Sequence, residues 1–436
     1  MGETIYTQTI VYGDSLQSTC KHQEPDPKFM LVGRDRMGNP IRIPMGEQLL
    51  SRHMLLMGGI GTGKSNAFQF LIRNLRNSLT ERDVMIIFDT KGDYYNSFYR
   101  SGDIVIGNDK RATGDSGEDY WNLFEEISVD DRIEENALEI ANNLFADRLR
   151  QSSQPFFPNA AKDLFGALLL HILRTDTLSN YRNNLDLRSM FDTFSVEAMK
   201  RILAIHPDLR ALQSYIEDER SGQTLGIVSE LQQLVREIFV GNFKKRGSLS
   251  MRHLVRKKGA KVIFIEYDLS LGSTLTPIYK LLFDLAIKEA LCRTENEGNV
   301  YFIIDEFRLL PNLHHIDDGV NFGRSLGAKF VVGVQNVDQI SAAYGADLAK
   351  SILSGFGTNI SFRVNDVNSR EYIKGLYGGN MRLHTYLSAV QSRGIFEDLR
   401  EGNVIEDVDI TSLNTGEAII GIMSGSPFYF KFNRFT

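Results

Sequence analysis

Short runs of apolar residues recur along the chain and are separated by segments of different character. Most positions in these runs are aliphatic or aromatic, so the runs lack the alternation of half-buried strands. Continuous apolar strands are typical of a parallel sheet that is covered on both faces. The expected strands are Met54–Met57, Val84–Phe88, Asp103–Ile106, Val262–Glu266, Val300–Ile304, Lys329–Val334, Asn359–Arg363 and Glu417–Ile422. We therefore expect an α/β fold with a mostly parallel central sheet.

The pattern changes to a helical period between residues 128 and 258. One apolar stripe with this period contains Ala160, Leu164, Ala167, Leu168 and Ile172. No convincing strand interrupts the segment, so an all-α insertion in an α/β domain is the simplest account. The predicted division is a small strand-rich segment at 1–50 that includes Phe29–Val32, an all-α domain at 128–258, and an α/β domain made from 51–127 and 259–436.

A complete GxxxxGK[ST] phosphate-binding loop follows the first of the predicted central strands. It stands between that strand and a helical pattern, which is the context that the motif requires. The expected apolar face of this helix contains Phe68, Leu71, Ile72, Leu75 and Leu79. Backbone N–H groups of the loop and the start of the helix would surround a phosphate. The residues expected to bind the nucleotide are Gly58, Gly59, Ile60, Gly61, Thr62, Gly63, Lys64 and Ser65.

A second nucleotide-site motif lies far along the chain. The strand Val300–Ile304 ends in Asp305 and Glu306, which is the Walker B pattern. In a site for ATP and Mg²⁺, Lys64 would reach the β- and γ-phosphates, while Ser65 and Asp305 would hold the metal ion. Glu306 is placed to polarise the attacking water, so the pair of carboxylates favours hydrolysis over binding alone.

Gln335 follows the apolar strand Lys329–Val334. In a RecA-like P-loop NTPase this strand lies between the two Walker strands, and Gln335 would then reach the γ-phosphate or the attacking water. The alternative is an amide that only ends a strand. The order of the strands in the sheet decides between these interpretations.

Composition and charge change this picture in one place. The 436 residues are 24% charged with a net charge of −6, so no overall field attracts nucleic acid. Residues 241–261 nevertheless contain eight Lys or Arg and no acid. This run is either a DNA-backbone contact or a solvated face. Its candidate DNA-binding residues are Lys244, Lys245, Arg246, Arg256, Lys257 and Lys258, with Arg252 and Lys261 in the same run.

Four ordered elements together resemble the type IV secretion system coupling proteins, which are conjugative DNA-transfer ATPases related to the FtsK/HerA class of DNA pumps. The resemblance extends from about residue 30 to the carboxyl terminus. It is carried by Gly58–Ser65, by Phe88–Asp93 with Tyr120–Phe124, by Pro155–Lys162, and by Ile303–Phe307 with Gly323–Ala328 and Gln335. The ordered set is more specific than either Walker motif alone.

The resemblance implies a RecA-like nucleotide-binding domain and an all-α domain that faces the cytoplasm. It also implies a homo-hexamer, which forms on assembly even if the isolated chain is a monomer. Such a hexamer binds relaxase-bound single-stranded DNA and delivers it to a type IV secretion channel. The nucleotide would lie between subunits, so a neighbour would supply an arginine finger. Arg363 is the first candidate for this finger and Arg370 the second, and a surface role is the alternative for both.

Members of that family carry N-terminal membrane helices, and this sequence has no apolar run of about 18 residues. We therefore expect a cytoplasmic protein at the inner face of the membrane, held there by a missing anchor or by a partner. Two functions stay open besides the coupling ATPase. One is a nucleotide-switched docking hub that does not pump DNA, and the other is a general FtsK/HerA-type DNA translocase.

Overall fold

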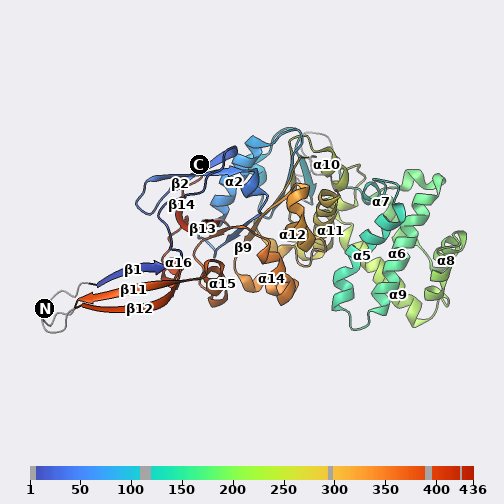
Figure 1. The fold of residues 1–436 in the computed structure, drawn as a ribbon. Helices are drawn as coiled ribbons and strands as arrows, with labels where there is room; N and C mark the ends of the chain where they lie inside the picture. Colours follow the sequence, from blue (N-terminus) through green and yellow to red (C-terminus); the bar gives the residue numbers. More distant parts are fainter. Residues whose placement is uncertain (1–5, 109–118, 293–297, 388–394, 423–424) are drawn as a thin grey trace. The chain divides into compact units, whose positions relative to one another are not determined.

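A computed structural model of the chain describes residues 6–108, 119–292, 298–387, 395–422 and 425–436 (Figure 1). Backbone contacts divide the chain into two compact units. The first unit contains Met1–Leu79, Tyr301–Arg308 and Val320–Thr436, and the second contains Thr80–Val300 and Leu309–Gly319. These units divide the chain differently from the domain boundaries expected from sequence, which stay a prediction.

The elements that lie wholly or mostly in the first unit are strands joined by helices and by short 3₁₀ turns. They are β1 (Tyr6–Tyr12), β2 (Pro27–Arg34), β3 (Pro40–Gly46), α1 (Glu47–Leu50), β4 (Met54–Met57), α2 (Lys64–Ser78), β8 (Val300–Ile304), η5 (Phe307–Leu309), α12 (Ile316–Leu326), β9 (Ala328–Val334), α13 (Val337–Tyr344), α14 (Ala346–Ser354), β10 (Thr358–Ser361), α15 (Val367–Tyr377), β11 (Gly379–Leu387), β12 (Ile395–Asn403), α16 (Asp407–Thr411), β13 (Glu417–Ile422) and β14 (Phe428–Phe432).

The main sheet of the first unit has the strand order β3-β2-β14-β13-β10-β4-β9-β8. Its centre is parallel, because β4 pairs in parallel with β10 on one side and with β9 on the other. From β10 outward to β3 the pairs are antiparallel. The predicted α/β class with parallel central strands is confirmed. Strand β9 lies between β4 and β8, as expected for a RecA-like sheet.

The central strands form because their side chains are apolar on both faces. Every residue of β4, β8 and β9 is buried. Helix α2 contributes Phe68, Leu71, Ile72 and Leu75, each 0% exposed, whereas Leu79, the last residue of the expected face, lies just beyond the helix and is half-buried. Burial of each such side chain stabilises the fold by about 1.5–3 kcal/mol. The packed core thus fixes the loop that joins β4 to α2.

Two features of the antiparallel side differ from the sequence expectation. Strand β10 ends at Ser361, so Arg363 lies beyond the strand to which the sequence assigned it. Strands β3 and β14 were not expected as separate strands. Pro40 and Pro44 lie within β3, and proline is depleted in strands except at sheet edges, which is where β3 lies.

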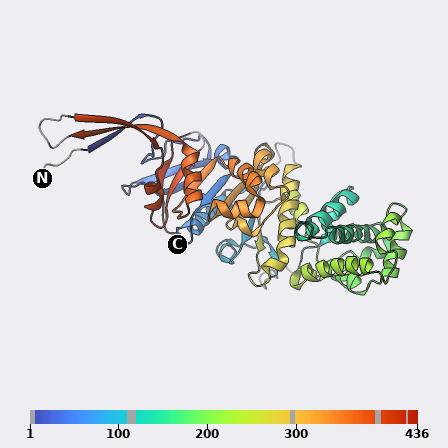
Figure 2. The same ribbon diagram turned by 90° about the horizontal axis from the view of Figure 1, so that it is seen from below.

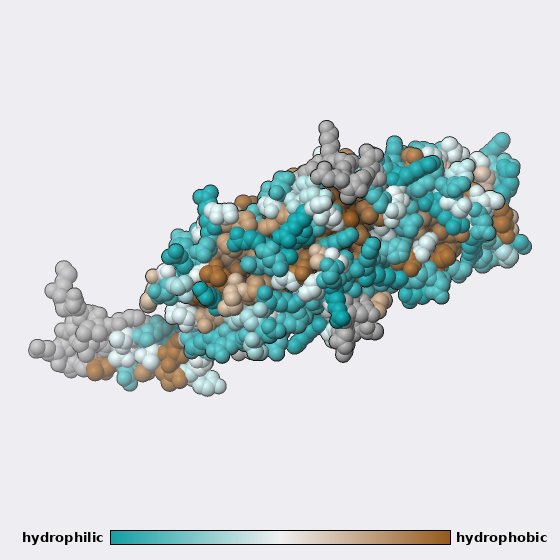
Figure 3. Space-filling view, turned by 90° about the horizontal axis from the view of Figure 1, so that it is seen from above, coloured by the Kyte–Doolittle hydropathy of each residue, from teal (hydrophilic) through white to brown (hydrophobic). Residues whose placement is uncertain are grey.

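A separate three-stranded sheet, β1-β11-β12, also went unpredicted (Figure 2). Both of its strand pairs are antiparallel. The exposed apolar side chains on it include Val11, Ile395 and Leu399, which are between 53% and 64% exposed. Figure 3 shows hydrophobic residues beside the grey residues at the end that carries this sheet. The sequence signal is weak here because polar residues are at least as numerous as apolar ones in both strands of the hairpin.

The second unit contains three neighbouring strands and a set of helices. The strand order is β5-β7-β6, with both pairs parallel. Its elements are β5 (Val84–Asp89), α3 (Asp93–Phe98), β6 (Ile104–Gly107), α4 (Leu123–Ile127), α5 (Ile133–Gln151), α6 (Phe156–Arg174), η2 (Asp176–Tyr181), α7 (Asn184–Thr193), α8 (Val196–Ile205), η3 (Arg210–Ile216), α9 (Gly222–Ile238), η4 (Gly241–Lys244), α10 (Met251–Lys257), β7 (Lys261–Glu266) and α11 (Gly272–Leu291).

The segment from α4 to α10 is all-α, as expected. The apolar stripe predicted on α6 is buried, with Leu164 0% and Leu168 1% exposed. Helix α6 packs against α5 and α9. The described residues of this segment contain one isolated bridge, between Trp121 and Leu249, and no strand.

Candidate functional site

The loop between β4 and α2 is tied to three other segments of the first unit. The N–H of Gly58 donates to the carbonyl of Val334 at 3.1 Å, and the N–H of Gly59 donates to the carbonyl of Arg363 at 3.0 Å. Thr62 accepts at its own carbonyl from the N–H of Gly416 at 2.8 Å. These contacts hold the loop open in the shape that a phosphate requires, with Ile60 89% exposed at its tip.

The start of helix α2 is suited to bind an anion. Gly63 is the N-cap of the helix and has no side chain that could accept from the first N–H groups of the helix. Such N–H groups can donate to a bound anion. Lys64 begins the helix and is only 8% exposed. The start of the helix therefore presents backbone N–H groups next to Lys64, which is the arrangement that the phosphate-loop prediction expects.

The two Walker motifs meet in the structure. The Ser65 hydroxyl donates to Oδ2 of Asp305 at 3.1 Å, although the two residues are 240 positions apart. Hydroxyl and carboxylate oxygens are ligands that Mg²⁺ prefers. The chemistry of these two side chains thus fits the metal site that the sequence predicts for Ser65 and Asp305.

Glu306 lies beside Asp305 at the end of β8 and touches two side chains. Its Oε2 accepts from Nε2 of Gln335 at 3.0 Å, and its Oε1 accepts from Nε of Arg308 at 2.9 Å. Gln335 follows β9, which lies between the two Walker strands. The structure therefore places Gln335 on the expected edge of the sheet, where it binds the candidate base.

The two candidate arginine fingers are in different environments. Arg363 has an exposed side chain, while its carbonyl binds the phosphate loop through Gly59. Arg370 lies in α15 with its side chain 20% exposed, and its Nε donates to Asp407 at 2.8 Å. A second nitrogen of Arg370 donates to the carbonyl of Asn365. Arg370 is held within its own chain, so Arg363 is the freer of the two.

Two arginines of the basic run at 241–261 are neutralised by the same carboxylates of the second unit. Arg252 is 2% exposed and pairs with Asp130 and Glu289. Arg256 pairs with the same two carboxylates, at 3.0 and 2.6 Å.

The remaining cations of the run fall into two groups. Lys245 donates to the Tyr120 hydroxyl at 2.9 Å, Arg246 pairs with Asp186 at 3.0 Å, and Lys258 is buried. Lys244 and Lys257 are exposed, and neither makes a hydrogen bond or ion pair with any residue that the structure describes. Of the six candidates for DNA contact, these two are the available ones.

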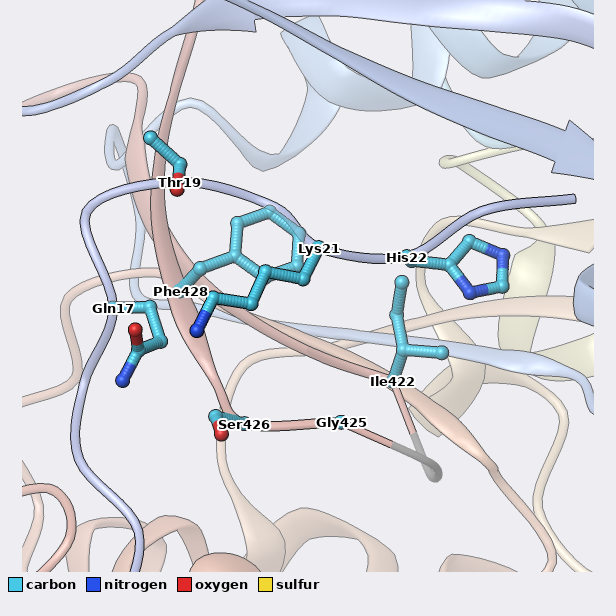
Figure 4. A pocket seen from close by; sticks show the side chains of 8 residues that line it. All are labelled: Gln17, Thr19, Lys21, His22, Ile422, Gly425, Ser426 and Phe428. Atoms are coloured by element: carbon cyan, nitrogen blue, oxygen red, sulfur yellow. The ribbon is translucent and has the colours of Figure 1, made fainter.

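A cavity of about 110 Å³ lies elsewhere in the first unit (Figure 4). The close-up shows Lys21, Gln17 and Ser426 around it, with Phe428 beneath. None of its lining residues is a predicted site residue. The convergence of phosphate loop, carboxylates and amide identifies the candidate site better than a hollow does, because those groups carry the chemistry.

Sequence reasoning missed three residues that contribute to the candidate site. Gly416 and Thr415 contact the phosphate loop through Thr62 and Gly61, but they are more than 350 residues away and belong to no motif. Arg308 was also missed. Its spacing of two residues from Glu306 was the one signal that would have identified it.

A glycine-rich loop after one central strand, with paired carboxylates after a strand two places away, defines a RecA-like P-loop NTPase. The sequence profile of a family described as the type IV secretion-system coupling protein DNA-binding domain matches residues 40–426, and the chain belongs to this family. No curated protein sequence is significantly similar to the chain.

Solved structures agree with the fold. The bacterial conjugative coupling protein TrwBdeltaN70 in complex with sulphate gives a TM-score of 0.73, and TrwB in complex with the ATP analogue ADPNP gives 0.74. Each is 18% identical, and each alignment covers 98% of this chain and 95% of the other. VirB4 of Thermoanaerobacter pseudethanolicus gives 0.58 at 14% identity, covering 94% and 97%. Among the helices that the structure describes, none has both the length and the apolar character needed to cross a membrane.

Proposed function

We propose that this chain is an ATP-hydrolysing coupling protein that recruits a relaxase–single-stranded DNA complex and drives DNA into a type IV secretion channel. Family membership supports the secretion role. The contact between Ser65 and Asp305 carries the proposal of catalysis, because it joins the phosphate loop to the Walker B strand. A binding protein without hydrolysis would not need Glu306 beside them.

Related structures support a nucleotide with Mg²⁺ as the ligand of this site. TrwB has been solved with ADPNP, with ADP and Mg²⁺, and with the GTP analogue GDPNP. In this chain Lys64 would bind the β- and γ-phosphates, and Ser65 and Asp305 would hold Mg²⁺. The metal ion supplies charge neutralisation at the phosphates when it is bound.

The proposed reaction is attack of water on the γ-phosphate. Glu306 would accept a proton from the water, and Gln335, at 3.0 Å from Glu306, would orient the water or the γ-phosphate. In a homo-hexamer at the cytoplasmic face of the membrane, Arg363 of a neighbouring copy would stabilise the charge that develops. Arg370 is the weaker candidate because Asp407 holds it.

A nucleotide-switched docking hub is the second candidate function. The paired state of Arg246, Arg252 and Arg256 favours it, because few cations of the basic run are left for DNA. A general FtsK/HerA-type translocase would share the catalytic site and differ in its partners. Binding of a relaxase distinguishes the coupling protein from the general translocase. Stimulation of hydrolysis by DNA distinguishes both of these from the docking hub.

Hydrolysis of ATP and of GTP, measured with and without single-stranded DNA, tests the proposal. We expect DNA to stimulate the wild-type rate and Lys64→Ala to abolish it. Glu306→Gln should lower kcat by about 10²–10⁴-fold while binding of ADPNP is retained, because only the base is lost. Equal rates for Lys64→Ala and wild type would reject this site. Binding of a relaxase with a rate that DNA does not change would instead support the hub.

A further inference from the structure

Both carboxylate oxygens of Glu306 are engaged by side chains of the first unit. Nε of Arg308 lies 2.9 Å from Oε1, and Nε2 of Gln335 lies 3.0 Å from Oε2. The Glu306 side chain is 19% exposed and that of Arg308 is 48% exposed. One contact comes from the turn that follows β8, and the other comes from the end of β9.

This arrangement weakens Glu306 as a general base. A base needs a lone pair that points at the water. The two donors hold one oxygen each, so Arg308 and Gln335 fix the direction in which the Glu306 carboxylate faces. Gln335 already has a proposed partner in the γ-phosphate. Arg308 has no such role, so it is the residue that restrains Glu306.

The backbone around Arg308 is fixed while its side chain has room to move. Phe307, the residue before it, is 1% exposed and stacks on Tyr344 with ring centroids 5.2 Å apart. The pair of Arg308 with Glu306 is half exposed, and pairs of this kind contribute little stability. A phosphate matches the fork of a guanidinium at least as well as a carboxylate does.

We propose that Arg308 is a positioning residue that restrains Glu306. A phosphate oxyanion replaces Glu306 as the partner of Arg308, and this exchange frees the base for hydrolysis. The oxyanion comes from the backbone of bound DNA or from the nucleotide. The inference rests on the proposed function, since it assigns a regulator to the same site. It also gives a direct link between occupancy of the site by a polyanion and the rate of hydrolysis.

Steady-state hydrolysis of Arg308→Ala tests the restraint, with Arg42→Ala as a control because Arg42 is exposed on β3. We expect DNA-free kcat to rise roughly 3–10-fold, a fraction of what a general base contributes. A rise in kcat is a result that a merely structural role would not produce, because loss of structure lowers activity. Arg308→Lys should be intermediate. An unchanged or lower DNA-free kcat for Arg308→Ala would overturn the restraint.

Binding measurements distinguish the two sources of phosphate. If DNA is the source, Arg308→Ala loses stimulation by DNA, and the salt dependence of oligonucleotide binding falls by about one in slope. If the nucleotide is the source, Kd for ADPNP rises and the response to DNA remains. If the wild type does not hydrolyse ATP, the proposed function fails, but the binding data still test whether Arg308 exchanges Glu306 for a phosphate. The exchange is rejected if Arg308→Ala changes neither the affinity for the oligonucleotide nor the affinity for ADPNP.

Discussion

Residues in the left-handed backbone region stand at both ends of the segment that forms the phosphate loop. Gly63 has φ of +106°, and a Cβ there would lie 2.8 Å from the N atom of Gly416, so the position admits only glycine. His53, just before β4, has φ of +56° although it is not a glycine. Its Nδ1 accepts from the N–H of Phe330 at 3.1 Å, which ties the start of β4 to the start of β9.

The buried imidazole of His53 makes the stability of the fold depend on pH. Burial, with a contribution from the charge of Lys329, lowers the pKa of His53 to about 4. The neutral form is the one that accepts from Phe330. Between about pH 6.5 and pH 4 the unfolded chain binds the proton more tightly, so stability falls as the pH falls through this window, by about 3 kcal/mol in all.

Urea unfolding of wild type and His53→Asn across this pH range measures the effect. Asparagine tolerates the left-handed region and keeps an acceptor, so the variant should fold and lose most of the pH dependence. His253→Asn, at an exposed position, is the matched control. If the unfolding free energy of His53→Asn depends on pH as that of the wild type does, the pH dependence belongs to another group.

At the scale of elements, the site depends on loops that follow adjacent parallel strands. Strands β4, β9 and β8 are neighbours in that order, so the phosphate loop, Gln335 and the Walker carboxylates meet at one edge of the sheet. The placement of residues on a helix also explains which cations of the basic run are accessible. Helix α10 carries Arg252 on its buried side and Lys257 on its exposed side, and only the exposed side is available to DNA.

Two substitutions in α10 distinguish a residue needed for stability from a candidate for DNA contact. Arg252→Ala removes the buried partner of Glu289, which is 6% exposed and keeps Arg256, and should cost about 1–3 kcal/mol of unfolding free energy. Lys257→Ala should change stability by less than about 0.5 kcal/mol and should weaken DNA binding, with a smaller salt slope. Unfolding curves and oligonucleotide titrations check both. Unchanged DNA affinity in Lys257→Ala would remove this helix from the DNA-binding surface.

At the scale of the whole molecule, the proposed mechanism assigns one residue of the site to a second copy of the chain. The phosphate loop, the carboxylates and Gln335 all belong to the first unit of one chain, and Arg363 and Arg370 are the two candidates for the finger. The carbonyl of Arg363 supports its own phosphate loop, while its side chain is exposed.

Mixing two inactive variants tests whether Arg363 acts across subunits. Arg363→Ala should lower kcat by about 10³–10⁵-fold and retain ADPNP binding, as loss of an arginine finger does. A mixture with Lys64→Ala should recover part of the activity, because an intact phosphate loop then meets an intact Arg363 of the neighbour. Arg370→Ala serves as the comparison. Absence of recovery in the mixture would show that Arg363 acts within its own chain.

The sequence by itself determined the ligand class, the central strands and the α/β class, since continuous apolar runs and a phosphate loop are local signals. It also indicated the family, through four motifs in a fixed order. Strand order, the pairing of Ser65 with Asp305 and the separate sheet β1-β11-β12 required the tertiary structure, because they depend on contacts between distant segments. The same reason explains why the sequence could not tell which cations of the basic run are exposed. Whether a cation is free is decided by its neighbours in space, and Asp130 and Glu289 had already paired with two of them.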